Sequence, residues 1–139
     1  MPYLTVSHRG HHRFEVNVEG HRLIVDEGLA AGGRDTGPTP TELLAASLAS
    51  CAAAYAESYL SSRGYATAGL QITCHYQLST DHPRRVSALD VTVTAPFEIS
   101  NEHRRSVMKA VENCLVGNTL RVPPLIHTML IAPEEAPVG

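Results

Sequence analysis

Hydrophobic and polar residues alternate over 14–25, near the start of the chain. Glu19 and Gly20 interrupt the alternation, and the hydrophobic positions then resume on the same face. Two-residue connections containing glycine are typical of antiparallel strand pairs. We therefore expect a β-hairpin over about 12–26, with a short strand before it at 3–7.

A long helix is predicted after a loop rich in glycine and proline at Gly28–Pro40. Thr39 precedes the helix, and Glu42 follows three residues later, which is the pattern of a capping box. The helix is expected to run to about Arg63, with Gly64 as its C-terminal cap. The larger side chains of the helix form one stripe: Leu44, Leu48, Cys51, Tyr55 and Tyr59. Its other faces carry mostly Ala and Ser, so we expect the helix to be central and buried.

Strict alternation returns over 70–79 and predicts a strand of about ten residues. Asp81 and Pro83 then mark a turn at Thr80–Arg85. A second strand is expected from Leu89 to Ala95.

The last third of the chain predicts one more helix and one more strand. The helix follows Ser100, a good N-cap residue, and Gly117 is expected to end it. The apolar segment Leu125–Ala132 is expected to form a strand, and Pro133–Gly139 to be a frayed tail. The order β-β-β-α-β-β-α-β indicates an α+β fold with antiparallel sheets, in a single domain over 1–139.

Composition narrows the functional classes. The 139 residues are 43% hydrophobic, which is enough for a core without disulfides. The net charge of −3 argues against a nucleic-acid partner, which needs a basic face. The uncharged stretch Leu43–Ala56 is shorter than the roughly 20 apolar residues that span a bilayer. Met1–Gly20 has no apolar run of the kind found in signal peptides. We therefore expect a cytoplasmic protein with reduced thiols and no membrane association.

Three cysteines carry the candidate chemistry. None belongs to a Cys-x-x-Cys pair, so no structural zinc site is expected. Cys51 is either a small buried hydrophobe or, if a cation lies near it, a reactive thiolate. Cys114 lies on the apolar side of the second predicted helix, and two packed helices can bring it near Cys51. Cys74 is expected to be a core residue of its strand.

Other chemically active side chains cluster before the long helix. Four of them are histidines: His8, His11, His12 and His21. No further set of residues with the spacing of metal ligands accompanies them, so no metal site is expected. Arg34 lies in the glycine-rich loop. It is either a solvated loop residue or a cation that folds over a buried thiol.

Two segments resemble the OsmC/Ohr family of organic hydroperoxide reductases. Gly37–Cys51 resembles its Pro-x-Glu-Leu-Leu helix start, with a cysteine nine residues after the Glu. Cys114–Leu120 is similar to the family's Cys-Pro-Val-His-x-Thr-Leu segment. The resemblance extends over Phe14 to Ile131 and includes the expected order of elements.

This resemblance implies a thiol-dependent peroxidase that reduces organic hydroperoxides to alcohols in oxidative stress defence. Cys51 would be the peroxidatic thiol, Cys114 the resolving thiol, and Arg34 the arginine that holds Cys51 as a thiolate. The family implies an intertwined homodimer with active sites at the interface. It also implies that no cofactor is needed beyond an external dithiol or lipoyl-type reductant.

Several positions depart from the family pattern, as in a divergent branch. Thr41 stands where the peroxidases carry an acidic residue that pairs with the arginine, and Glu42 follows one position later. Asp35, beside Arg34, is an alternative partner. Two further replacements follow the second cysteine, at Leu115 and Gly117. These changes leave a second hypothesis open: a binding or structural dimer with little peroxidase turnover.

Overall fold

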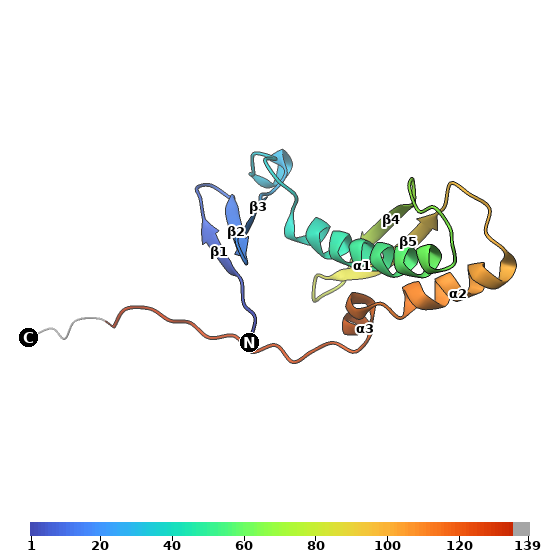
Figure 1. Cartoon of the computed structure of the whole chain (residues 1–139). Helices are drawn as coiled ribbons and strands as arrows, with labels where there is room; N and C mark the ends of the chain where they lie inside the picture. The colour runs from blue at the N-terminus through green and yellow to red at the C-terminus, as the bar shows by residue number, and fades with distance from the viewer. Residues whose placement is uncertain (135–139) are drawn as a thin grey trace, which may run out of the picture.

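The computed structural model describes residues 1–134 and shows an α+β fold with two antiparallel sheets (Figure 1). One sheet comes from the N-terminal quarter of the chain and stands apart from the rest. The other sheet is covered by helices. The elements are β1 (Thr5–His8), β2 (Phe14–Val18), β3 (His21–Val25), the 3₁₀ turn η1 (Leu29–Ala31), α1 (Pro40–Ser62), β4 (Gln71–Leu78), β5 (Val86–Thr94), α2 (Asn101–Glu112) and α3 (Leu115–Arg121).

The N-terminal sheet has the strand order β1-β2-β3, with both neighbouring pairs antiparallel. Glu19 and Gly20 connect β2 to β3, with positive φ angles of 47° and 83°. Two residues with positive φ give a turn whose twist matches that of the flanking strands. The predicted hairpin and the short strand before it are therefore confirmed.

Both ends of α1 are set by local sequence. The Thr39 side chain accepts a hydrogen bond from the Glu42 N–H at 3.1 Å, and the Glu42 carboxylate accepts one from the Thr39 N–H at 3.0 Å. At the other end, Gly64 has a left-handed φ of 86°, and the Tyr65 N–H bonds back to the Leu60 carbonyl. This is the Schellman arrangement, in which glycine avoids the strain of positive φ. The predicted capping box and C-terminal glycine are confirmed.

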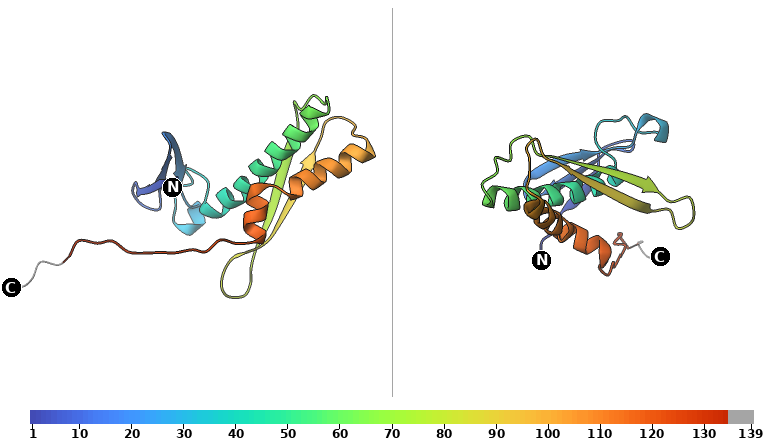
Figure 2. Two further views of the ribbon diagram at one scale, coloured as in Figure 1. Left: turned by 60° about the horizontal axis from the view of Figure 1, so that its bottom comes forward. Right: turned by 90° about the vertical axis from the view of Figure 1, so that its right-hand side faces the viewer.

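The buried face of α1 differs from the predicted stripe. Leu48 is buried as expected, but Leu44 and Tyr55 are exposed in the single chain, and Cys51 and Tyr59 are half-buried. The buried side chains are mostly alanines because they let α1 approach β4, β5 and α2 closely (Figure 2). They are Ala45, Leu48, Ala52, Ala56 and Leu60.

The core lies where α1 crosses α2 and the β4–β5 sheet. Ala52, Ala56 and Leu60 pack there against Val107 and Val111 of α2. By length and composition alone, α1 also qualifies as a possible membrane span. Its contacts with β4, β5 and α2 are those of a helix in a folded core.

The second predicted helix is two helices. It ends at Glu112, and Cys114 is then the N-cap of α3, which begins at Leu115. The prediction that Gly117 ends the helix was wrong, because Gly117 lies inside α3 and is buried there. The apolar pattern continues through Cys114, so the sequence indicates one helix. The backbone at Cys114 is extended, however, and it divides the segment into two helices.

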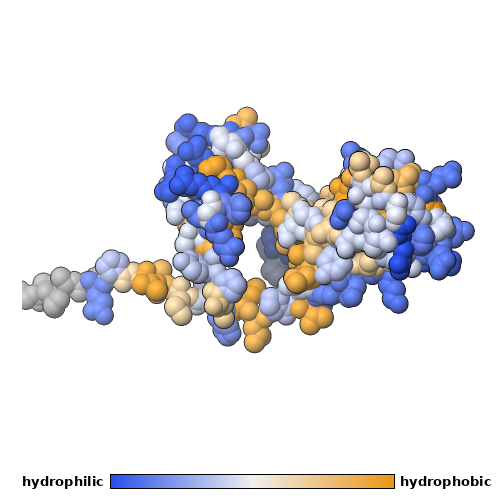
Figure 3. Space-filling model, viewed as in Figure 1, coloured by the Kyte–Doolittle hydropathy of each residue, from blue (hydrophilic) through white to orange (hydrophobic). Residues whose placement is uncertain are grey.

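The predicted strand at Leu125–Ala132 is absent, since residues 123–134 form no helix or strand in the single chain. The segment runs outward with its apolar side chains exposed, as orange surface along it shows (Figure 3). A strand needs a partner for its backbone N–H and C=O groups, and among residues 1–134 no strand pairs with this segment. Most of the predicted frayed tail, residues 135–139, lies outside the described residues.

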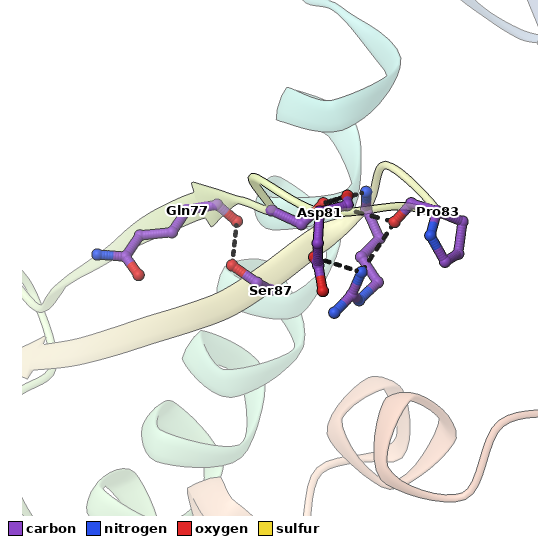
Figure 4. A network of polar contacts seen from close by, with 6 residues as sticks. Gln77, Asp81, Pro83 and Ser87 are labelled. Carbon is purple, nitrogen blue, oxygen red and sulfur yellow. Dashed lines mark hydrogen bonds and ion pairs between the residues drawn. The ribbon is translucent and has the colours of Figure 1, made fainter.

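The turn between β4 and β5 is held by a polar network (Figure 4). Buried Ser79 accepts a hydrogen bond from the Arg85 N–H at 3.0 Å through its hydroxyl. The Arg85 guanidinium donates to the Asp81 carboxylate at 3.0 Å and to the Pro83 carbonyl at 2.9 Å. These contacts keep the register of the two strands on which α1 rests.

Candidate active site

Cys51 and Cys114 come together where α1 meets the connection between α2 and α3. Cys51 projects from the middle of α1, and Cys114 is the N-cap of α3. Both sulfurs lie against the first turn of α3, although the two residues are far apart in the sequence. Both thiols are reduced. Cys51 is half-buried, whereas Cys114 is 1% exposed.

Each sulfur accepts a backbone hydrogen bond from the first turn of α3. The Val116 N–H donates to Cys51 Sγ at 3.4 Å, and the Gly117 N–H donates to Cys114 Sγ at 3.3 Å. Amide N–H groups in a first helical turn have no partner within the helix, so they are free to bind a nearby acceptor. The same turn of backbone therefore orients both sulfurs.

The environments of the two thiols differ. Burial raises the pKa of Cys114, and the neighbouring Cys51 raises it further. The Gly117 N–H and the positive charge of Arg121 act in the opposite direction. The thiolate is the reactive form of cysteine, so Cys114 is a poor first nucleophile and the more accessible Cys51 is the better one.

A groove of about 430 Å³ lies between α1, β5 and α3, and its lining combines apolar side chains with Ser87 and Arg121. It shares Leu48 and Gly117 with the surroundings of the two sulfurs, and Arg121 lies at its edge. Its walls come from α1, β5 and α3: Leu44, Leu48, Val86, Ser87, Ala88, Leu89, Gly117, Leu120 and Arg121. The groove has the size and polarity to hold the hydrocarbon part of a small organic molecule.

Arg34, the predicted partner of Cys51, makes its contact elsewhere within one chain. Its Nη2 donates a hydrogen bond to Nε2 of His11 at 2.8 Å. It lines a small cavity of about 180 Å³ that also includes Asp26 and Thr36. The structure therefore brings Cys51 and Cys114 together but does not bring Arg34 to them in the same chain.

The two acidic candidates also have local partners. Hydrogen bonds from Thr39 lower the pKa of Glu42, so its carboxylate serves the capping box. Asp35 has a positive φ of 54°, and its N–H donates to the Glu27 carbonyl. Within the described part of the chain, neither carboxylate forms an ion pair with Arg34, and the contacts of both residues shape the segment that leads into α1.

Cys74 is separate from the pair. It lies on β4 opposite Val91 of β5, and burial followed by the nearby Asp90 carboxylate raises its pKa. Cys74 is half-buried and does not belong to the buried core, so the expectation that it is a core residue was wrong. In the part of the chain that the structure describes, no group of three or more His, Cys, Asp or Glu residues is arranged to hold a metal ion.

Comparison with known proteins agrees with the fold. A family model for OsmC-like proteins matches residues 32–128, a span that contains both cysteines and Arg34. This chain belongs to the OsmC-like protein family. No curated protein is similar enough to this OsmC-like chain to count as a match.

Solved structures of OsmC-like proteins share the fold. A structure from Psychrobacter arcticus 273-4, provisionally described as an osmotic stress induced and detoxification response protein, has 24% identity and a TM-score of 0.78. The match covers 86% of this chain and 88% of that one. An OsmC-like protein from Mycoplasma pneumoniae has 16% identity and a TM-score of 0.71, covering 87% of each chain.

A third similar structure carries a functional description. It is an organic hydroperoxide resistance protein OsmC from Legionella pneumophila, with 20% identity and a TM-score of 0.62. The match covers 86% of this chain and 89% of that chain. At these identities the structural likeness establishes the fold of the OsmC-like chain and nothing finer.

Sequence reasoning missed the contribution of α3. Arg121 lies seven positions after Cys114, two helical turns along, which is a spacing that places side chains on one face. Because the helix was expected to end at Gly117, Arg121 was not expected to share a helix face with Cys114. The N–H groups of Val116 and Gly117 carried no sequence signal, because backbone donors are not residue-specific.

Proposed function

We propose that this chain is a thiol-dependent peroxidase that reduces organic hydroperoxides, with Cys51 as the peroxidatic thiol and Cys114 as the resolving thiol. The observation that carries the proposal is that the sulfurs of the two free thiols lie against one turn of α3, each accepting a hydrogen bond from an α3 backbone N–H. Membership in the OsmC-like family and the description of the Legionella pneumophila neighbour support it.

The first step is attack of the Cys51 thiolate on the terminal oxygen of the hydroperoxide. The O–O bond breaks, the sulfur is oxidised to a sulfenic acid, and the alkoxide leaves and takes up a proton as an alcohol. Cys51 is suited to this step because it is the more accessible of the two thiols. The Val116 N–H is placed to donate to the thiolate.

The second step joins the two sulfurs. The Cys114 thiolate attacks the Cys51 sulfenic sulfur, the S–O bond breaks, and the hydroxide leaves as water after protonation. The product is a Cys51–Cys114 disulfide. An external dithiol, of lipoyl type or similar, then reduces the disulfide by thiol–disulfide exchange and is itself oxidised. The cycle therefore needs no bound cofactor.

The groove between α1, β5 and α3 supports organic hydroperoxides as substrates. An alkyl or aryl group that enters it leaves water and gains about 25 cal/mol for each Å² of apolar surface buried. Hydrogen peroxide has no such group, so it gains nothing from the walls formed by Leu44, Leu48 and Leu89. We expect the preference to appear mainly in KM.

We further propose that the working unit is a homodimer in the cytoplasm, without nucleic-acid or membrane partners. The apolar side chains of the C-terminal segment are exposed in the single chain, including Leu125, Ile126 and Leu130. A patch of this kind is typical of a protein interface. In the proposed dimer, Arg34 would lie near a Cys51 side chain and would stabilise its thiolate.

The test follows the thiols of the reduced protein after one equivalent of cumene hydroperoxide, with hydrogen peroxide in parallel. We expect rapid loss of two thiols per chain and a Cys51–Cys114 disulfide located by mass spectrometry. Cys51→Ser should abolish the fast reaction. Cys114→Ser should leave a Cys51 sulfenic acid that dimedone traps.

Cys74→Ser is the matched control, because Cys74 lies on β4 and neither Cys51 nor Cys114 is among the causes that shift its pKa. It should react at the rate of the unmodified protein. If Cys51 reacts no faster than free cysteine, the peroxidase proposal fails. The binding or structural dimer with little turnover then becomes the better hypothesis.

A further inference from the structure

Gly117 leaves an unfilled position between Arg121 and Cys114. A Cβ atom at Gly117 would lie 3.0 Å from Cys114 Sγ and 3.1 Å from Arg121 Nη1. The guanidinium and the sulfur therefore flank one point, with no side chain between them. A side chain at this position would force both groups to shift by a few tenths of an ångström.

The arginine is anchored in this place. Its Nη1 donates a hydrogen bond of 2.6 Å to the carbonyl of Glu112, the last residue of α2. The carbonyls at the end of a helix have no partner within it, so they are natural acceptors for a guanidinium. The contact ties α3 back to α2 and holds the positive charge beside the turn that contains Cys114.

We propose that Arg121 is a positioning residue for the resolving step, whose positive charge favours the thiolate of Cys114 when it attacks the sulfenic acid of Cys51. This inference rests on the proposed peroxidase function and assigns a residue to its second step. In the described residues, the titratable groups that act on Cys114 are Cys51 from α1 and Arg121 from α3.

The chemistry of the step explains why a cation is useful there. Burial and the neighbouring Cys51 both oppose loss of the Cys114 proton. Once Cys51 has become a neutral sulfenic acid, its own negative charge no longer opposes the Cys114 thiolate. Burial remains, and two groups offset it: the Gly117 N–H, which has the larger effect, and the positive charge of Arg121. Attack by Cys114 then forms the S–S bond and releases water, with no further reactant.

The inference separates the two steps of the reaction. Removing the charge in Arg121→Gln should leave sulfenic acid formation at Cys51 within about twofold of the unmodified protein. Disulfide formation should slow by about three- to tenfold at pH 7, because a larger share of Cys114 stays protonated. The pH at which resolution reaches half its maximal rate should rise. Arg121→Lys, which keeps the charge, should restore most of the rate.

The experiment mixes reduced protein with cumene hydroperoxide, quenches in acid at successive times, and measures intact masses. Sulfenic acid, trapped with dimedone, and disulfide are counted separately from pH 6 to pH 9, at low and at high salt. Arg105→Gln is the matched control, since it removes the same charge from the exposed surface of α2. Circular dichroism establishes that each variant is folded.

The outcomes are distinct. If the unmodified protein forms no Cys51–Cys114 disulfide, the proposed function has failed and the inference falls with it. Slower resolution in Arg121→Gln that disappears at high pH, shrinks with salt and is rescued by Lys supports the inference. Resolution at the unmodified rate overturns it. So does slowing that is equal at every pH and that Lys does not rescue, because that indicates a structural role for the Glu112 contact.

Discussion

Arg34 donates a hydrogen bond through Nη2 to Nε2 of His11, at 2.8 Å, across 23 positions of sequence. A guanidinium has donors only, so His11 must present an unprotonated Nε2 and carry its proton on Nδ1. The contact holds the loop before α1 against the connection between β1 and β2. In the single chain, Arg34 is therefore bound to His11, although the proposed mechanism needs Arg34 to hold Cys51 as a thiolate.

The tautomer of His11 is therefore a testable property. Long-range ¹H–¹⁵N correlation spectra at pH 8 should show His11 in the Nδ1–H form. In Arg34→Gln the bond is lost, and His11 should shift toward the Nε2–H form. His21, on β3, should keep its spectrum in both proteins. A His11 signal unchanged by Arg34→Gln would contradict the contact.

The loop that carries Arg34 depends on a glycine at position 37. A Cβ at Gly37 would overlap the carbonyl oxygen of Ile24 on β3. We expect Gly37→Ala to lower the free energy of unfolding by about 1–3 kcal/mol, because loop or strand must move to relieve the clash. Urea unfolding measures the change. Gly28→Ala is the control, since an added Cβ there meets nothing within 4 Å and should cost little.

Asp26 makes the same loop sensitive to acid. Its buried carboxylate accepts hydrogen bonds from the Thr36 hydroxyl at 2.6 Å and from the N–H groups of Thr36 and Glu27. The Thr36 hydroxyl is the largest of the causes that lower the pKa of Asp26 from 3.8 to about 2. The carboxylate is thus favoured in the folded state. It contributes stability above about pH 4, and this contribution is lost as the pH falls toward 2.

Urea midpoints measured from pH 6 to pH 2 check this pH dependence. The unmodified protein should lose stability between pH 4 and pH 2. Asp26→Asn should be less stable at pH 6 and should show a flatter profile over that range. Thr36→Val, which removes the strongest donor, should move the loss of stability to higher pH. Equal slopes in all three proteins would exclude Asp26 as the group responsible.

The exposed C-terminal segment predicts self-association. Ile126 and Leu130 are 84% and 90% exposed in the single chain, so a charge at either position costs the folded monomer little. In a dimer that buries them, each substitution would remove about 1.5–3 kcal/mol of apolar burial. Sedimentation equilibrium of Ile126→Glu and Leu130→Glu should therefore show weaker association. Thr128→Glu, an exposed polar position in the same segment, is the control.

A result against the dimer would be equally clear. If the unmodified protein sediments as a monomer at all concentrations tested, the exposed segment has another explanation. Arg34 could then reach the cysteine pair only by rearrangement within the chain. The placement of Cys51 and Cys114 against α3 would be unaffected, because both residues belong to one chain.

Local sequence determined the elements whose interactions lie within a few residues. The capping box of Thr39 and Glu42, the glycine at position 64 and the Glu19–Gly20 turn all satisfy backbone groups of their immediate neighbours. Such interactions are encoded in short segments, so they could be predicted without knowing the fold. The family motifs extended the prediction to the pairing of Cys51 with Cys114.

Tertiary structure decided what depends on residues far apart. Which face of α1 is buried depends on what packs against it. The alanine face is buried and Tyr55 is exposed, because small side chains allow closer contact between elements. Leu125–Ala132 has the composition of a strand, but the described part of the single chain offers no strand that pairs with it. Arg34 contacts His11, and Arg121 lies by Cys114, because hydrogen bonds to residues of other elements hold each guanidinium. The sequence pattern shows which side chains are available for contact, whereas the tertiary structure determines which of them contact each other.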